Sequence, residues 1–120
     1  MEAYREFGFE AAHVLPNVEA GHKCGRLHGH SYRVRVYVAG PVDPASGMVV
    51  DFAEIAAACE PLRSQLDHYY LNEVDGLENP TSENLARWLW ERLEGSLDLS
   101  RIVVSETCTS GVEYKGRGPA

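Results

Sequence analysis

Apolar and polar residues alternate along two stretches of the first forty residues. Between Arg5 and His13, one face carries Phe7, Phe9, Ala11 and His13. From residue 28 onward the alternation is cleaner, and one face carries His28, His30, Tyr32, Val34, Val36 and Val38. Side chains of a β-strand point alternately to opposite faces, so both stretches predict strands. The second strand would place both imidazoles, His28 and His30, on its apolar side.

Two later segments show the three- and four-residue spacing of amphipathic helices. Asp51 is expected to start the first, paired with Glu54, and its apolar stripe consists of Phe52, Ile55, Ala56 and Cys59. Pro61 predicts a kink or a break in that helix, because proline has no N–H to donate. Thr81 or Ser82 is expected to cap the second helix, whose apolar stripe consists of Leu85, Trp88, Leu89 and Leu93.

The remaining segments complete the expected topology. Gly40 to Gly47 is rich in turn residues, and Ile102 to Thr107 with Gly111 to Tyr114 predicts a closing antiparallel pair of strands. The element order predicts a single α+β domain over residues 1–120, an antiparallel four-stranded sheet with two helices on one face. Four strands leave two open edges, which predicts association of copies through the sheet.

Composition narrows the classes of function. A chain of 120 residues with 44% hydrophobic residues can fold without disulfides or a structural metal. Its apolar runs are far shorter than the roughly 20 residues that span a bilayer, so we expect no membrane partner. MEAYREFGF lacks the features of a signal peptide, and we expect a cytoplasmic protein with three reduced cysteines. The net charge of −7 argues against nucleic-acid binding.

Basic residues nevertheless cluster around the stretch GHKCGRLHGH and near the C-terminus, notably Lys23, Arg26 and Lys115. Such clusters can receive an anionic small molecule, or they can be solvated surface.

Three histidines are candidates for a metal site. His28 and His30 lie on one strand face and can both reach one ion at about 2.0–2.1 Å. If the first two strands form a hairpin, His13 approaches them. Three imidazoles and a water molecule are typical of a catalytic zinc, although histidines satisfied within the core are the alternative. A structural zinc finger is disfavoured, because Cys24 is the only thiol nearby.

Two further groups could transfer protons. Basic neighbours and a metal would favour the thiolate of Cys24, making it a nucleophile or general base, whereas an exposed loop thiol is the alternative. Cys59 is expected in the core. Asp67 and His68 could form an acid–base couple or simply end a helix. Because adjacent residues on a helix do not face each other, the couple requires a loop geometry.

Glu106 is a candidate for ligand binding. It is in phase with Ile102 and Val104, which would place its carboxylate on the apolar face; the opposite phase would leave it in water. A buried carboxylate can accept two parallel N–H groups from a flat heterocycle. Thr81 and Ser82 are helix caps by default, and their hydroxyls could also meet a polar ligand.

Taken in order, FEAAHVL, CGRLHGHSY, GMVVDF, LDHYYLN, PTSENLA and VSET resemble the 6-pyruvoyl-tetrahydropterin synthase/6-carboxytetrahydropterin synthase family, from about Phe7 to Tyr114. The three-residue gap between Cys24 and His28 resembles the bacterial carboxytetrahydropterin synthases of the queuosine route. The biopterin-making branch typically has a longer gap. The resemblance implies a tunnelling fold, with trimers whose sheets join into a barrel, stacked as a dimer of trimers with sites between subunits.

The resemblance also implies a role for each candidate residue. The zinc ligands would be His13, His28 and His30. Cys24 would be the general base, with Asp67 and His68 completing the proton-transfer set. Glu106 would anchor the pterin ring, assisted by Thr81 and Ser82.

The implied reaction is that of a zinc-dependent lyase. It would convert 7,8-dihydroneopterin triphosphate to 6-carboxy-5,6,7,8-tetrahydropterin and release acetaldehyde and triphosphate. Two alternatives stay open: a 6-pyruvoyl-tetrahydropterin synthase, which eliminates triphosphate without carbon–carbon cleavage, and a non-catalytic assembly module stabilised by zinc.

Overall fold

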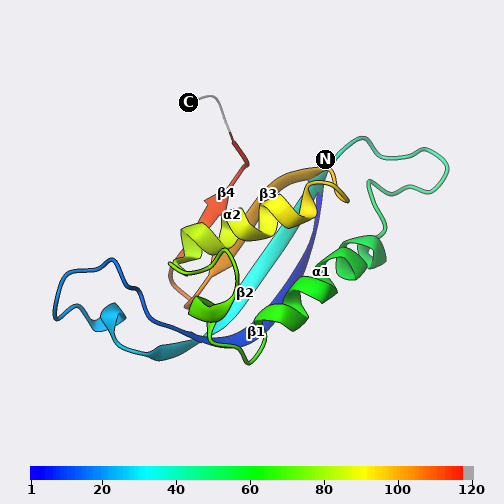
Figure 1. The fold of residues 1–120 in the computed structure, drawn as a ribbon. Coiled ribbons are helices and arrows are strands. Elements are labelled where there is room, and N and C mark those ends of the chain that lie inside the picture. The colour runs from blue at the N-terminus through cyan, green and yellow to red at the C-terminus, as the bar shows by residue number, and fades with distance from the viewer. Residues whose placement is uncertain (118–120) are drawn as a thin grey trace.

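Two long strands and two shorter ones form the sheet of the computed structural model, which describes residues 1–117 (Figure 1). β1 (Glu2–His13) pairs with β2 (His28–Ala39), which pairs with β3 (Leu99–Ser105), which pairs with β4 (Gly111–Tyr114). All pairings are antiparallel, which confirms the predicted four-stranded antiparallel sheet, and the strand order is β1-β2-β3-β4. The β1–β2 register sets His13 opposite His28 and Ala11 opposite His30.

The third strand ends earlier than predicted. Ser105 pairs with Gly111, and a tight turn follows in which the Thr107 and Ser110 hydroxyls lie 2.7 Å apart. The expected strand end at Thr107 is therefore wrong, because the chain must already reverse there. Ile102 and Val104 are fully buried, so of the two phases considered from the sequence, the one with these residues on the apolar face is observed.

The first helix, α1 (Phe52–Leu66), begins after Asp51, whose Oδ1 accepts from the Ala53 N–H at 2.9 Å. It runs without a break through Pro61, so the break considered from the sequence does not occur. Pro61 lies on the exposed side of the helix, where water can hydrate the carbonyl group that lost its partner.

The buried face of α1 is shifted along the helix from the predicted stripe. It consists of Ile55, Cys59, Leu62 and Leu66. Phe52 is 55% exposed and lines an open cavity with the exposed side chain of Met48. The predicted burial of Phe52 is wrong, because the first turn of α1 lies beside the exposed 40–50 loop rather than over the core.

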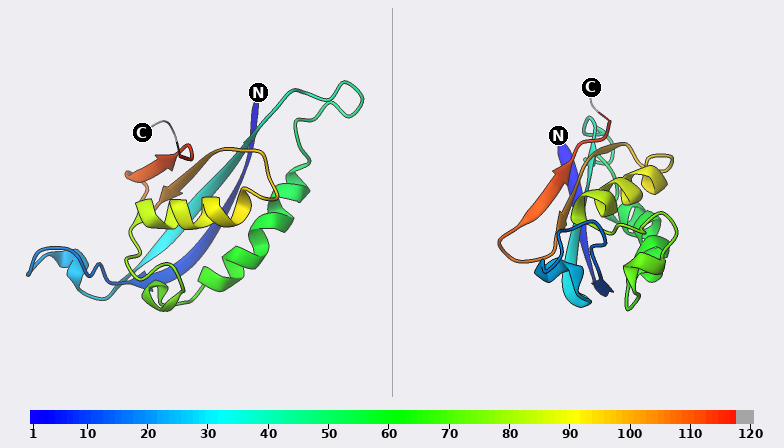
Figure 2. Two further views of the ribbon diagram at one scale, coloured as in Figure 1. Left: turned by 45° about the horizontal axis from the view of Figure 1, so that its top comes forward. Right: turned by 60° about the vertical axis from the view of Figure 1, so that its left-hand side comes forward.

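The second helix, α2 (Ser82–Leu93), is capped by Thr81, whose Oγ1 accepts from the Asn84 N–H at 3.1 Å. Its predicted stripe is fully confirmed by the buried residues Leu85, Trp88, Leu89 and Leu93. Both helices cover the same face of the sheet, α1 over β1 and α2 over β3 and β4 (Figures 1 and 2). The other face carries ion pairs such as Arg35–Glu6 and Arg101–Glu2.

Two connections lead towards the histidines. The loop between β1 and β2 holds a short 3-10 turn, η1 (Lys23–Gly25), and projects well beyond the sheet (Figure 2). A second 3-10 turn, η2 (Leu71–Glu73), follows α1. Within residues 1–117, no helix combines the length and apolarity needed to cross a membrane.

Candidate metal centre and its surroundings

The three candidate histidines converge at one end of the β1–β2 pair. One ring nitrogen from each of His13, His28 and His30 lies within 4.8 Å of those of the others. His13 is 1% exposed, and the other two are partly buried. The hairpin register explains the cluster, because His13 faces His28 directly and His30 is the next residue on the same face of β2.

The hydrogen bonds of two rings determine their tautomers. His13 Nδ1 lies 2.8 Å from the Pro80 carbonyl oxygen, and His28 Nδ1 lies 2.7 Å from that of Arg26. A carbonyl oxygen only accepts, so both Nδ1 atoms carry the proton in the neutral rings. Both Nε2 atoms then present lone pairs, yet they lie 2.9 Å apart. A cation bound by both nitrogens would relieve this repulsion.

His30 supplies a third observation. Its Nε2 is buried without a hydrogen-bond partner among the described residues, and the Glu106 carboxylate lies 3.6 Å away. An orphaned buried nitrogen beside two converging lone pairs fits a metal ion bound by three imidazoles. Carbonyl acceptors on the far nitrogens of His13 and His28 are also typical of metal-binding histidines, because they fix the ring orientation.

Burial also favours the neutral form of the His13 ring. It lowers the pKa of the ring, because desolvation disfavours the charged form; the Pro80 carbonyl opposes this only in part. The neutral form is the one that binds a metal. The Tyr32 hydroxyl, 3.1 Å from His13 Nδ1, gives this nitrogen a second neighbour.

Asp67 and His68 form a couple at the end of α1. Asp67 caps the helix, and His68 adopts a φ of 62°, which turns its ring back so that Nδ1 lies 3.0 Å from Asp67 Oδ1. This is the loop geometry that the couple requires. The Glu10 backbone N–H, 3.0 Å from Oδ1, and then His68 and Arg63 hold the pKa of Asp67 below its usual range. Asp67 is thus an anion that orients an exposed imidazole.

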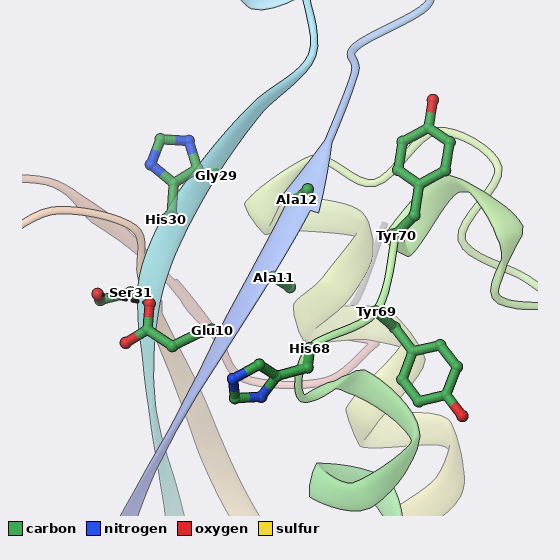
Figure 3. Close-up of a pocket in the computed structure, with 9 residues that line it drawn as sticks. All are labelled: Glu10, Ala11, Ala12, Gly29, His30, Ser31, His68, Tyr69 and Tyr70. Carbon is green, nitrogen blue, oxygen red and sulfur yellow. Dashed lines mark hydrogen bonds between the residues drawn. The ribbon is translucent and has the colours of Figure 1, made fainter.

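An open pocket of about 480 Å³ is lined by one residue of the couple, His68, and one residue of the histidine cluster, His30 (Figure 3). His30 lines it from β2, and His68 lies on the other side of β1 (Figure 3). Glu10 and Ser31 hydrogen-bond to each other along one side at 2.8 Å, and Tyr69 also lines the pocket. His30 and His68 are therefore the two candidate site residues that line this pocket, whereas His13, His28 and Asp67 are not among its lining residues.

Glu106 lies just beyond β3 and reaches the start of α2. Its Oε1 accepts from the Ser82 hydroxyl at 2.7 Å, and its Oε2 is the oxygen near His30. The Thr81 Oγ1 accepts the capping hydrogen bond at the start of α2. The structure thus brings the carboxylate, the Ser82 hydroxyl and the metal cluster together, with Thr81 beside them in sequence.

Cys24 lies on η1, in the loop between β1 and β2. It is half-buried. Its backbone carbonyl accepts from the Leu15 N–H at 2.9 Å, and its own N–H donates to His22 Nδ1 at 3.0 Å. The loop that carries it extends away from the end of α1, where Asp67 and His68 lie (Figures 1 and 2). Within one chain, Cys24 does not meet that couple.

Sequence reasoning missed three groups around the histidines. Tyr32 follows His28 and His30 on the same strand face, and this phase could have identified it. The Pro80 carbonyl belongs to the backbone and has no sequence signal. Asn72, whose side chain bonds to the backbone of Val14, ends the motif LDHYYLN, but nothing in that motif indicates its partner.

Comparisons with known proteins agree on one family. A sequence model described as 6-pyruvoyl tetrahydropterin synthase matches residues 2–117. The 6-carboxy-5,6,7,8-tetrahydropterin synthase of Synechocystis sp. is 51% identical over 118 residues, which cover 92% of this chain and 90% of that protein. The human 6-pyruvoyl tetrahydrobiopterin synthase is 34% identical over 134 residues, covering 93% and 89%. The solved structure of the Caenorhabditis elegans 6-pyruvoyl tetrahydropterin synthase matches with a TM-score of 0.89 and 30% identity, covering 98% and 96%.

Proposed function

The chain belongs to the 6-pyruvoyl tetrahydropterin synthase family, and we propose that it is a 6-carboxy-5,6,7,8-tetrahydropterin synthase. It converts 7,8-dihydroneopterin triphosphate and water to 6-carboxy-5,6,7,8-tetrahydropterin, acetaldehyde and triphosphate. The observation that carries this choice of product is the 51% identity to the Synechocystis enzyme of that name over most of both chains. The three-residue gap between Cys24 and His28 supports the same branch.

His13, His28 and His30 would hold a zinc ion. Three neutral imidazoles leave a coordination position open, as in catalytic rather than structural sites. When bound, zinc acts as a Lewis acid that polarises oxygens of the substrate side chain. The orphaned Nε2 of His30 and the facing lone pairs of His13 and His28 support this assignment.

Glu106 anchors the pterin ring in this proposal. Its carboxylate accepts two N–H groups from the flat, guanidine-like edge of the ring. Ser82 already donates to Glu106 Oε1, which orients the carboxylate. Thr81 accepts from the Asn84 N–H and keeps its own hydroxyl hydrogen for the ligand.

Proton transfer falls to Cys24, Asp67 and His68. The Cys24 thiolate removes a proton from the substrate side chain, and His68 returns one at another carbon. Asp67 faces His68 Nδ1 at 3.0 Å, so the Nε2 edge of His68 is the one that meets the substrate. Lys23 and Arg26, exposed on the same loop as Cys24, are candidate partners of the triphosphate.

A complete site then requires more than one copy of the chain. Cys24 lies on a loop that projects from the body, whereas Asp67 and His68 lie at the end of α1 (Figure 1). A neighbouring copy would bring the two together, in a homohexamer built as a dimer of trimers. This assembly, together with a cytoplasmic location, is part of the proposal.

One assay tests the function. The purified protein, loaded with Zn²⁺, is incubated with 7,8-dihydroneopterin triphosphate, and the products are identified by mass spectrometry. Acetaldehyde together with a carboxypterin is the expected result. A tetrahydropterin with an intact pyruvoyl side chain would instead assign the second candidate, 6-pyruvoyl-tetrahydropterin synthase, which the 0.89 TM-score to the C. elegans enzyme supports. An unchanged substrate would reject both and favour a non-catalytic zinc module.

A further inference from the structure

The last part of the outer edge of β1, at Glu10 and Ala12, is paired with the segment that follows α1. The Glu10 N–H donates to Asp67 Oδ1, the His68 N–H donates to the Glu10 carbonyl at 2.6 Å, and the Ala12 N–H donates to the Tyr69 carbonyl at 3.2 Å. Ala12 and Tyr70 form a parallel bridge. The metal-bearing end of β1 is therefore held on its free edge by the segment that begins with the Asp67–His68 couple.

Asn72 makes the last contacts between this segment and the end of β1. Its Oδ1 accepts from the Val14 N–H at 2.9 Å, and its Nδ2 donates to the Val14 carbonyl at 2.7 Å. The same Nδ2 lies 3.4 Å from the Glu78 carbonyl. One primary amide offers both the acceptor and the two donor hydrogens that these three contacts need, whereas a carboxylate or an alkyl group does not.

These contacts converge on His13. Val14 directly follows His13, and Glu78 lies two residues before Pro80, whose carbonyl accepts from His13 Nδ1. Asn84 supports the same loop, because its Nδ2 donates to the Asn79 carbonyl at 2.9 Å. Asn72 thus links the backbone that carries the imidazole to the loop that orients it.

We propose that Asn72 is a positioning residue of the metal centre, holding the end of β1 against the loop that presents Pro80 so that His13 Nε2 faces the metal. The inference rests on the zinc site of the proposed function. It goes beyond that site by assigning a residue that touches neither the metal nor the substrate.

The test measures Zn²⁺ affinity of the full chain by competition with a chromophoric chelator. Loss of a group that hydrogen-bonds a metal ligand typically costs 10- to 100-fold in metal affinity. Asn72 contacts the backbone next to His13 and not its ring, so we expect Asn72→Ala to weaken Zn²⁺ binding by about tenfold, the lower end of that range. Gln65→Ala removes an exposed amide from α1 and is the matched control, with unchanged affinity expected. Equal affinity of Asn72→Ala and the wild type would overturn the inference.

A double-mutant cycle separates positioning from general destabilisation. If Asn72 acts through His13, Asn72→Ala has no further effect on Zn²⁺ affinity once His13→Ala is present. The same fold-loss in both backgrounds would contradict the inference. Should Asn72→Ala fail to fold, Asn72→Asp serves instead, because it keeps the acceptor for the Val14 N–H and loses both donors; wild-type affinity in that variant would also overturn it.

The outcome is distinguishable from failure of the proposed function. A wild-type chain that binds no Zn²⁺ would reject the metal site itself. A wild-type chain that binds Zn²⁺ and converts substrate, with an Asn72→Ala variant of equal affinity, would reject only the role of Asn72.

Discussion

The Nε2 atoms of His13 and His28 lie 2.9 Å apart, although the other nitrogen of each ring contacts a backbone carbonyl oxygen. Two neutral imidazoles so arranged turn lone pairs towards each other. A cation converts this repulsion into binding, and the neutral form of His13 is favoured by burial. This pair, with the orphaned Nε2 of His30, is the physical basis for the metal assignment.

The first prediction concerns metal content. His28→Ala removes one of three ligands, and the purified variant should contain a small fraction of the zinc held by the wild type, measured by elemental mass spectrometry. His22→Ala changes a histidine on the neighbouring exposed loop and should retain zinc. Full zinc retention by His28→Ala would contradict the ligand assignment.

Cys24→Ala should keep its zinc and its fold while losing turnover. Removing a general base typically costs about 10²- to 10⁴-fold in rate, and the loss should appear in kcat. Cys108, exposed in the turn between β3 and β4, provides the matched thiol control: Cys108→Ala should remain active. Near-normal kcat in Cys24→Ala would remove its role as the base.

Glu106→Gln tests recognition of the ring. The amide oxygen can still accept from Ser82, but the charge that binds two N–H groups is lost. Hydrogen bonds to charged groups contribute about 1.5–3 kcal/mol, so kcat/KM should fall by roughly 10- to 150-fold. Steady-state kinetics with intact zinc content would show it. An unchanged kcat/KM would place the pterin elsewhere.

Asp67→Asn should alter the pH dependence of stability. The pKa of Asp67 is lower in the folded chain than its ordinary value of 3.8, so its carboxylate stabilises the fold above that pH. The contribution is lost as the pH falls through the folded pKa. The wild type should therefore exceed Asp67→Asn in unfolding temperature at pH 6, and the difference should shrink below about pH 4. A constant difference across this range would show that the charge is unimportant.

Cys59 should resist alkylation in the folded protein. It is 4% exposed, and burial raises the pKa of its thiol to about 11. Treatment with iodoacetamide at pH 8, followed by peptide mass spectrometry, should label exposed Cys108 and leave Cys59 unmodified until denaturant is added. Labelling of native Cys59 would contradict its place in the core.

Local sequence periodicity determined most of the fold. Alternation from His28 to Val38 required a strand with His28 and His30 on one face, because the backbone of a strand sends alternate side chains to opposite sides. The spacing of Leu85, Trp88, Leu89 and Leu93 likewise determined which face of α2 is buried. The sequence could not show that the first turn of α1, at Phe52, is exposed. Periodicity predicts which face of a helix is apolar, but not how far along the helix that face is covered by the sheet.

Only the tertiary structure decided how the candidate groups meet. Ser82 and Glu106 are 24 residues apart and come within 2.7 Å because α2 packs over β3. His68 faces Asp67 because its φ is 62°. The backbone carbonyl of Glu10 supports this conformation by accepting from the His68 N–H. No residue type in LDHYYLN requires it. The Asn72 side chain contacts the backbone of Val14, and the Pro80 carbonyl contacts the ring of His13, each across a long stretch of chain. The sequence identifies which side chains can bind a metal or transfer a proton. Which of them come into contact depends on how the helices and strands pack, because these contacts join segments that are far apart in the chain.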